Sequence, residues 1–384
     1  MTDHSMTERR FPEKMADFAK TRILTCPGLG EAGEFPEEIW AAMGKEGLLD
    51  PDLLRATGTF PCAAIAAAAR TMVSSGGNLG LALSWMIHHL VAGVLVRPCL
   101  VPGSSFREGC SWARPLWEKV KAGRTTISLA VSEPDAGAHP KFMAARAETR
   151  DDHILLSGEK TYLTNGPIAR AFCVIAVTGE REGRKEFSAF LADRDTPGLT
   201  VSAPMALPFF RPAPHGSIVM EDCRVEKERL LGREGKAFPD LVLPFRQFED
   251  AVMTGPVTGA MGFILGAVAR QMAGSSTAGS GDVTTLGSLR ALIDSAVFLS
   301  DRMAAMAGQG GTPLERLVLF FRQIAARFLE TVDTLLTDTG IVLNGPAGTL
   351  FRDLKSSSRI GGTVARIRQQ KLGQALMDQY TSTE

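Results

Sequence analysis

The sequence contains no closely paired cysteines. Its 384 residues include six cysteines, and no two of them are spaced as CxxC. Zinc sites and the disulfide frameworks of small domains use such spacings, so neither is expected. Free cysteines are typical of a reducing compartment, and we therefore expect a cytoplasmic protein. The six are Cys26, Cys62, Cys99, Cys110, Cys173 and Cys223.

The sequence also lacks an excess of either charge. Its 42 Lys and Arg residues balance 42 Asp and Glu residues, which gives a formal net charge of +0. Binding to nucleic acid usually requires a basic surface, so no nucleic-acid partner is expected. No metal-ligand set accompanies the adjacent His88 and His89, which we interpret as core residues. The segment SEPDAG is not a GxSxG nucleophile elbow.

Long uninterrupted apolar runs are missing as well. The N-terminal MTDHSMTERRFPEK has no apolar core of the kind that a signal peptide needs. The longest apolar region, Leu81–Val96, is interrupted by a serine, two histidines and a glycine. We interpret it as a buried helix, too short and too polar to span a membrane.

What is present divides into three zones. Residues 1–122 have helical spacing of apolar residues, as in Phe35–Leu49. Residues 123–238 hold short β-prone runs between turns and predict an antiparallel sheet. Residues 239–384 return to helical patterns and predict a bundle. The expected strands are 125–132, 153–158, 171–177, 187–192 and 216–220, and the expected later helices are 245–272, 286–306 and 314–336, with a loop at 273–282.

Five segments, in this order along the chain, carry a resemblance. They are FPEEIWAAMGKEGLL, LAVSEPDAGAHP, KTYLTNGPIARAFCVIAV, FLADRDTPGLTV with HGSIVMEDCRVEKERLLGREGKAF, and FRDLKSSSRIGGTVARIR. The second is similar to a TEPxAGSD motif, the third to KxWITNG and the last to RDAK…EGT. Together they resemble the acyl-CoA dehydrogenase family over most of residues 35–368. The resemblance implies a mostly α protein with an α-helical domain, a middle β-barrel domain and a C-terminal four-helix bundle.

The resemblance also implies FAD as the cofactor. Desaturation of a thioester needs a base for the proton beside the carbonyl, while flavin N5 accepts a hydride from the next carbon. By resemblance, Tyr162 packs on the flavin ring where the family usually has Trp, and Thr164 bonds N5. The other residues implied at the flavin are Leu129, Val131, Ser132, Gly137 and Thr363.

The catalytic base is expected at a less common position. Many family members carry a Glu in the last motif, but this chain has Gly361 there. The isovaleryl-CoA dehydrogenase branch places its base in a stretch similar to FEDAVMTGPVTG, and the matching residue here is Glu249. We therefore predict Glu249 as the base. Substrate contacts are predicted for Gly361, whose N–H would bond the thioester carbonyl, and for Ala138.

Several departures from the family leave alternatives open. The segment Ala273–Asp282 has no Arg or Lys, whereas the family usually has an Arg near this position that reaches the FAD pyrophosphate of a neighbouring subunit. The segment VLNGPAGT is a reduced form of another loop of the family. TNGPIA is similar to relatives that act on carrier proteins, so the substrate is an acyl-CoA or an acyl-ACP. The alternatives are a flavin-dependent oxidase or monooxygenase, and a non-catalytic subunit. The implied partners are an electron-transferring flavoprotein or another acceptor, in a homodimer or homotetramer, with a hetero-oligomer as the alternative.

Overall fold

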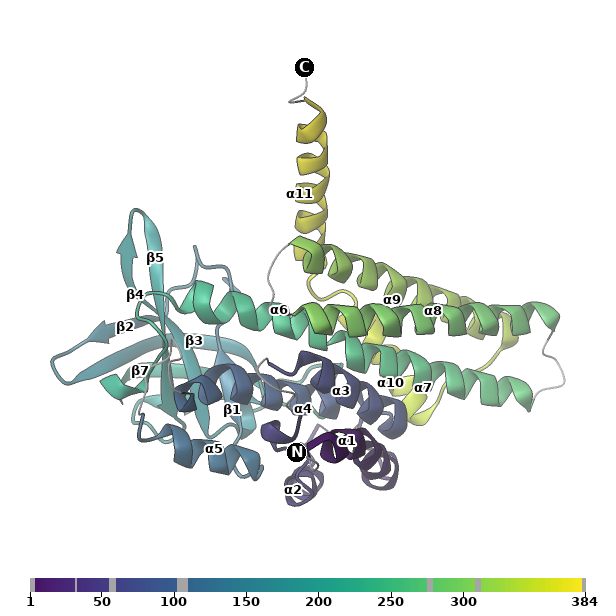
Figure 1. Ribbon diagram of the computed structural model, residues 1–384, viewed down its shortest axis with the longest axis horizontal. Coiled ribbons are helices and arrows are strands. Elements are labelled where there is room, and N and C mark those ends of the chain that lie inside the picture. The colour runs from purple at the N-terminus through teal and green to yellow at the C-terminus, as the bar shows by residue number, and fades with distance from the viewer. Residues whose placement is uncertain are drawn as a thin grey trace.

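Helices, a sheet and again helices follow one another in the computed structural model of this chain (Figure 1). The structure describes residues 4–31, 33–54, 60–101, 110–274, 279–307 and 312–381. The first group of helices is α1 (His4–Phe18), α2 (Glu37–Lys45), α3 (Cys62–Gly76), α4 (Leu79–Val91) and α5 (Ala113–Lys121).

Helix α4 is the centre of this first group, and all of its residues are buried. Asn78 caps it by accepting a hydrogen bond from the Leu81 N–H at 2.7 Å. His88 and His89 lie in the core, where their Nε2 atoms meet the carbonyls of Leu49 and Leu48 at 3.1 and 3.2 Å. Burial lowers the pKa of His88 to about 4, so this ring is neutral at physiological pH.

Among the described residues, three helical stretches are long and apolar enough to cross a membrane, judged by length and composition only: Leu79–Leu100, Phe238–Ala273 and Ser280–Met306. The expectation that the first is too short and too polar was wrong, because it extends over 22 residues with a mean hydropathy of 1.8 in spite of its polar interruptions. The predicted burial was right, since 94% of its most apolar window is buried inside the protein. The corresponding shares are 72% for the second stretch and 22% for the third.

The middle of the chain forms an eight-stranded sheet in which β6, β7, β3, β2, β4, β5 and β8 lie side by side and β1 pairs with β4. The sheet is mixed, not antiparallel as predicted, because β1 runs parallel to β4 and β2 pairs with β4 in parallel at one position. A parallel neighbour needs a long crossover, and residues 131–170 provide it between β1 and β4. The strands are β1 (Ile127–Ala130), β2 (Arg146–Thr149), β3 (His153–Thr164), β4 (Ala171–Arg181), β5 (Arg184–Asp193), β6 (Leu199–Val201), β7 (His215–Glu226) and β8 (Leu230–Leu231).

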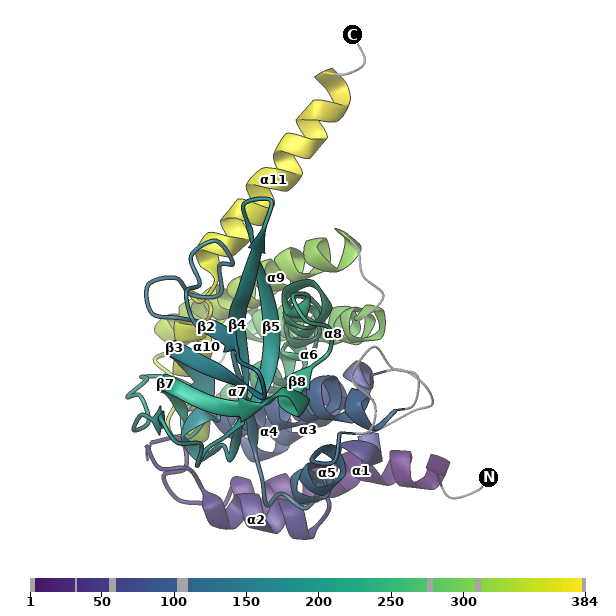
Figure 2. The ribbon, with the colours of Figure 1, turned by 90° about the vertical axis from the view of Figure 1, so that its left-hand side faces the viewer.

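Both faces of strand β4 are buried, and they belong to different cores. Cys173 and Ile175 face the helices and join the large helical core. Phe172 and Val174 point the other way, into a second core inside the curled sheet. The two sets alternate along β4 because successive side chains of a strand point to opposite faces of the sheet. One wall of the sheet is thereby fixed against the helices, and Figure 2 shows the molecule with the sheet toward the viewer.

The chain then returns to helices, with α6 leading almost directly into α7. Gly255 and Gly259 in α7 lie against the backbone of Ala66 and Arg70 in α3, where an added Cβ would meet carbonyl oxygens at 2.2 and 2.5 Å. Small residues on both helices therefore allow their close approach. The helices are α6 (Leu243–Val252), α7 (Thr254–Ala273), α8 (Ser280–Met306), α9 (Thr312–Thr339), α10 (Gly345–Ser357) and α11 (Gly362–Thr381).

Helices α8 and α11 complete this part of the chain. Helix α8 starts at Ser280, so the end of the predicted loop 273–282 is helical, and residues 275–278 of that loop lie outside the described residues. Helix α11 projects away from the body of the protein, as Figures 1 and 2 show. The last of the family-like segments, Phe351–Arg368, begins in α10 and ends in the first turns of α11.

Candidate active site

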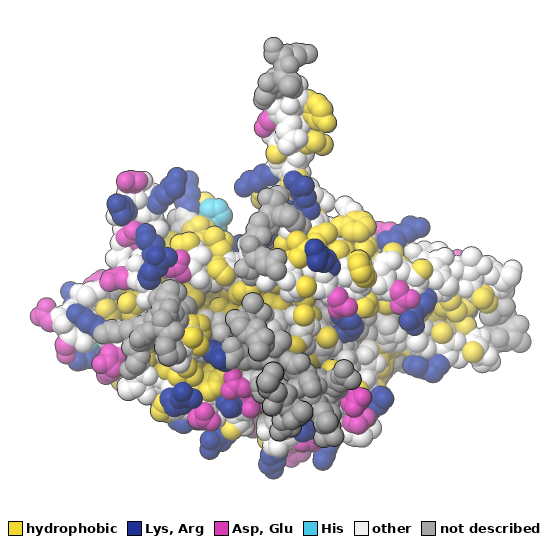
Figure 3. Space-filling view, in the orientation of Figure 1, with side chains coloured by type: hydrophobic (Ala, Val, Ile, Leu, Met, Phe, Trp, Pro, Cys, Tyr) yellow, Lys and Arg dark blue, Asp and Glu magenta, His cyan; other side chains and the backbone are white. Residues whose placement is uncertain are grey.

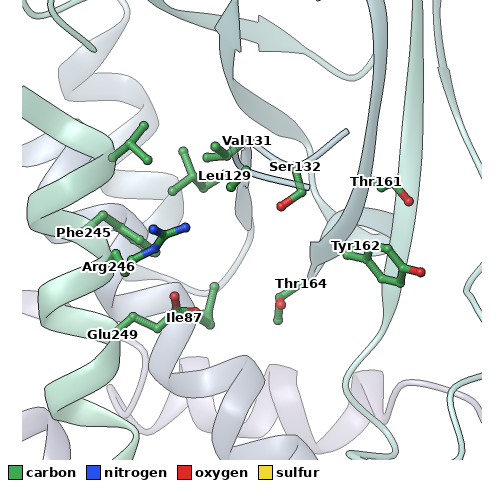
Figure 4. A pocket seen from close by; sticks show the side chains of 12 residues that line it. Ile87, Leu129, Val131, Ser132, Thr161, Tyr162, Thr164, Phe245, Arg246 and Glu249 are labelled. Atoms are coloured by element: carbon green, nitrogen blue, oxygen red, sulfur yellow. The ribbon is translucent and has the colours of Figure 1, made fainter. Parts of the chain in front are cut away.

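A pocket opens where helices α4 and α6 face the sheet. Its cavity volume is about 170 Å³, and about 680 Å³ of empty space surrounds this volume when the adjoining open solvent is included. In Figure 4, Glu249 and Arg246 extend from α6 on one side, and Thr164 and Ser132 stand on the opposite side. The lining residues are Ile87, Leu129, Val131, Ser132, Ala138, Thr161, Tyr162, Thr164, Val242, Phe245, Arg246 and Glu249.

Most of the residues predicted for the site share this pocket. They come from three separate stretches of sequence: Leu129, Val131, Ser132 and Ala138 around the end of β1, Tyr162 and Thr164 at the end of β3, and Glu249 on α6. The structure therefore brings the predicted base and the predicted flavin contacts to opposite walls of one cavity. Their roles remain predictions.

Three predicted residues do not line the pocket. Gly137 stands next to Ala138 in a tight turn, where it has a φ of 54° and exchanges two 2.9 Å backbone hydrogen bonds with Glu133. Gly361 has a φ of 68° in the turn between α10 and α11, and Thr363 is exposed in the first turn of α11. The contacts predicted for Gly361 and Thr363 are therefore not made from the walls of this pocket.

Glu249 has the environment of a general base. Its side chain is partly buried, and it makes no hydrogen bond or ion pair with any residue that the structure describes. Burial, with a smaller contribution from the neighbouring Asp250, raises its pKa to about 7. Asp250 itself is paired with Arg368 of α11, at 3.3 Å. Of these two adjacent carboxylates, only Glu249 is left to act in the pocket.

On the opposite wall, Tyr162 has a strained backbone. Its φ of 57° is unusual for an aromatic residue and coincides with a shift of the β3–β7 register between Lys160 and Leu163. Tyr162 is 64% exposed although it borders the pocket. Strain of this kind is concentrated at functional sites. An exposed aromatic ring here leaves a flat apolar surface free for a ligand.

A hydrogen-bond relay fixes the orientation of the Thr164 hydroxyl. His215 Nδ1 lies 3.1 Å from the Ala213 carbonyl, which can only accept, so Nδ1 carries the proton. Burial lowers the pKa of His215, which keeps the ring neutral and leaves Nε2 as an acceptor. Thr164 Oγ1 lies 3.1 Å from Nε2 and must donate to it. The lone pairs of Thr164 are therefore free to accept an N–H on the pocket side.

A buried ion pair lies behind the same wall. Lys160 Nζ donates to Glu133 Oε1 at 2.8 Å and to the Val131 carbonyl at 3.0 Å. The Glu133 carboxylate also accepts the N–H groups of Ala144 and Ala145, at 2.6 and 3.0 Å. Lys160 is completely buried and Glu133 is 8% exposed. These bonds tie β3 to the loop that presents Val131 and Ser132 to the pocket.

Sequence reasoning missed five lining residues: Ile87, Thr161, Val242, Phe245 and Arg246. A signal existed for Arg246, because it precedes Glu249 by three residues in a predicted helix and so shares its face. Phe245 lies within the same predicted helix. No local signal pointed to Ile87, since its place depends on how α4 packs against α6.

Residues 128–223 match the family described as acyl-CoA dehydrogenase, middle domain. A probable acyl-CoA dehydrogenase of Bacillus subtilis is 30% identical over 241 residues, which is 59% of this chain and 58% of that protein. The L-prolyl-peptidyl-carrier-protein dehydrogenase of Pseudomonas fluorescens is 28% identical over 60% of this chain and 59% of that protein. The matches thus span less than two thirds of these relatives' length. Residues 128–223 are therefore similar to the acyl-CoA dehydrogenase middle domain.

Solved structures of acyl-CoA dehydrogenases share the fold of the whole chain. A probable acyl-CoA dehydrogenase from Mycobacterium abscessus has a TM-score of 0.79 at 19% identity and covers 96% of this chain and 98% of its own. Butyryl-CoA dehydrogenase from Megasphaera elsdenii has a TM-score of 0.77 at 18% identity, over 98% and 99% of the two chains. The three-part architecture is therefore that of the acyl-CoA dehydrogenase fold.

The residues of this pocket fit the planar ring of a flavin. One wall offers aliphatic surface from Leu129 and Val131, the exposed ring of Tyr162, and a Thr164 hydroxyl oriented to accept. A ring bound against this wall would face Glu249 across the remaining space. Apolar contact with a few well-placed polar groups is the usual composition of a cofactor site.

Proposed function

We propose that this chain catalyses the FAD-dependent oxidation of an acyl thioester to the α,β-enoyl thioester. One observation supports this most strongly: a carboxyl group without a partner among the described residues, with a pKa of about 7, faces the family's flavin-contacting strands across a pocket. A general base works best when its pKa lies near the operating pH. The raised pKa of Glu249 supports it in this role.

In this proposal each wall has its own task. Glu249 removes the proton from the carbon beside the thioester carbonyl and holds it on its carboxylate. Leu129, Val131, Tyr162 and Thr164 hold the isoalloxazine of FAD, which supplies the hydride acceptor when bound. The sheet wall orients the ring, and the apolar Ile87 and Phe245 exclude water from the reacting carbons.

The carrier, partners and location are part of the same proposal. Relatives named for acyl-CoA substrates and one named for a peptidyl carrier protein both match the chain, so the thioester is on CoA or on a carrier protein. An electron-transferring flavoprotein or another acceptor would reoxidise the flavin. The six free cysteines suit the cytoplasm.

A homodimer or homotetramer would cover apolar side chains that lie on the surface. Phe298 of α8 is 77% exposed and Phe320 of α9 is 55% exposed. Figure 3 shows apolar side chains gathered over this part of the molecule. Exposed apolar surface of this kind often marks an interface. The molar mass in solution, from light scattering, tests this assembly.

The decisive experiment is anaerobic reduction of the bound flavin by a panel of acyl thioesters, followed by absorbance. Glu249→Gln keeps the size of the side chain and removes the base. We expect it to bind flavin normally and to be reduced at least about 100-fold more slowly, the usual lower value for the loss of a general base. Asp250→Asn is the matched control and should change the rate little, because Asp250 is paired with Arg368.

The same samples separate the alternatives. Near-normal reduction of Glu249→Gln by substrate would remove Glu249 from the role of base. Rapid reoxidation of the reduced protein by air, or a hydroxylated product, would indicate an oxidase or monooxygenase. A purified chain that binds no flavin until a sister chain is added would indicate a subunit of a heteromeric enzyme.

A further inference from the structure

A second charged side chain, Arg246, lines the pocket beside Glu249. Figure 4 shows its guanidinium extending from α6 into the gap between the helix and the sheet. It makes no hydrogen bond or ion pair with any residue in the described part of the chain. The nearby carboxylates do not serve as ion-pair partners of the Arg246 guanidinium. It forms no ion pair with Glu249, and Asp250 is paired with Arg368.

Arg246 affects the pKa of the neighbouring Glu249. Its positive charge lowers the pKa of Glu249, although burial and Asp250 raise that pKa overall. An arginine that only filled space could be replaced by an apolar residue such as the adjacent Phe245. A guanidinium has five N–H donors in a planar fork that matches a carboxylate. Its placement here therefore points to a ligand that brings the missing acceptor.

Helix geometry limits where that acceptor can be. Residues three apart on a helix have Cβ atoms roughly 5–6 Å apart, so Arg246 and Glu249 lie side by side on one face. The carbon that loses its proton must touch Glu249. An acceptor that meets Arg246 is then only a few bonds from that carbon. The phosphate of a pantetheine arm lies many bonds further from the thioester, so the acceptor belongs to the acyl group.

We propose that Arg246 binds a carboxylate on the acyl group, which makes the preferred substrate the half-thioester of a dicarboxylic acid. This inference rests on the proposed function and adds the class of acyl group. The bound carboxylate would pair with Arg246 in two parallel N–H···O bonds. Binding would also neutralise the charge that lowers the pKa of Glu249. Arg246 is thus a residue that determines specificity.

The test compares two CoA thioesters of equal chain length, one ending in a carboxylate and the other in its methyl ester. For each, kcat/KM is measured for wild type, Arg246→Gln and Arg246→Lys. Loss of a charged hydrogen bond typically costs about 10- to 100-fold, so we expect wild type to prefer the carboxylate by about that factor. In Arg246→Gln the ratio of the two kcat/KM values should fall to about one, and in Arg246→Lys part of the preference should remain. Arg290→Gln, which removes an exposed arginine from α8, is the control and should behave as wild type.

Two results would overturn the proposal. Wild type could oxidise the ester as well as the acid, or Arg246→Gln could slow both substrates equally, which would indicate a role at the thioester carbonyl or in folding. If no thioester reduces the flavin, the proposed function has failed separately. Calorimetric binding then still tests Arg246: tighter binding of the acid than of the ester, lost in Arg246→Gln, supports it, and equal affinities refute it.

Discussion

The two walls of the pocket are built in opposite ways. On the sheet side the polar groups have partners: Lys160 is paired with Glu133, and Thr164 is bonded to His215. On the helix side, Glu249 and Arg246 have no partner among the described residues. A wall whose polar groups are already hydrogen-bonded is rigid and suits a permanently bound cofactor, whereas unpaired charged groups are available to bind a substrate. This contrast predicts that substitutions on the sheet wall reduce stability and cofactor binding, and that substitutions on the helix wall alter catalysis.

The largest loss of stability is expected from Lys160→Met. This change leaves Glu133 buried without its counter-ion, and breaking a buried pair typically costs about 3–5 kcal/mol. The free energy of unfolding from urea titration measures the loss. Arg246→Met on the opposite wall should change it little.

A double variant sharpens this result. Lys160→Met with Glu133→Gln removes both charges and keeps an amide oxygen for the N–H groups of Ala144 and Ala145. It should be more stable than Lys160→Met alone. If the single and double variants are equally unstable, the cost comes from lost packing and not from a stranded charge.

Glu249→Gln should stabilise the protein at neutral and alkaline pH. The folded pKa of about 7 lies above the ordinary value of 4.5, so the protonated form is favoured by folding. Stability from this group is fully present below about pH 4.5 and is lost as the pH rises through 7. At roughly 1.4 kcal/mol per pKa unit, the variant gains up to about 3 kcal/mol above pH 7 and nothing below pH 4.5. Equal stability of wild type and variant across this range would contradict the raised pKa.

His215→Leu is expected to weaken flavin binding, which is a smaller effect than those above. This change removes the acceptor for the Thr164 hydroxyl, which can then rotate and no longer presents its lone pairs to the pocket. One neutral hydrogen bond is worth about 1 kcal/mol, so flavin should bind about fivefold more weakly, measured by flavin fluorescence. His153→Gln, at the far end of β3, is the control. Nitrogen NMR of wild-type His215 should show the proton on Nδ1, and a proton on Nε2 would disprove the relay.

The sequence predicted the order of elements and much of the pocket, because periodicity and motifs are local properties. The β-prone run Ala171–Val177 appears in the structure as part of β4, and the helical spacing in Phe245–Met272 appears as α6 with α7. The short strands β2, β6 and β8 were missed, since two to four residues carry too little pattern. The parallel pairing of β1 with β4 was missed because it depends on residues far apart in the sequence.

In the candidate site, too, contacts between residues far apart in the sequence were not predicted. Leu129, Thr164 and Glu249 were identified by motifs, and the structure places all three on one pocket. His215 was not recognised as a partner of Thr164, because 51 residues separate them and only the pairing of β3 with β7 brings them together. The pairing of Asp250 with Arg368 likewise depends on the direction in which α11 leaves the body.

The pH dependence of flavin reduction by substrate, followed by stopped-flow absorbance without oxygen, tests the central claim most directly. Glu249 must be deprotonated to accept a proton, so the rate in wild type should rise about tenfold per pH unit below pH 7 and level off above it. Glu249→Gln should be slow at every pH and show no such rise. A wild-type rate that is flat through pH 7, or the same rise in Glu249→Gln, would contradict the assignment of Glu249 as the base.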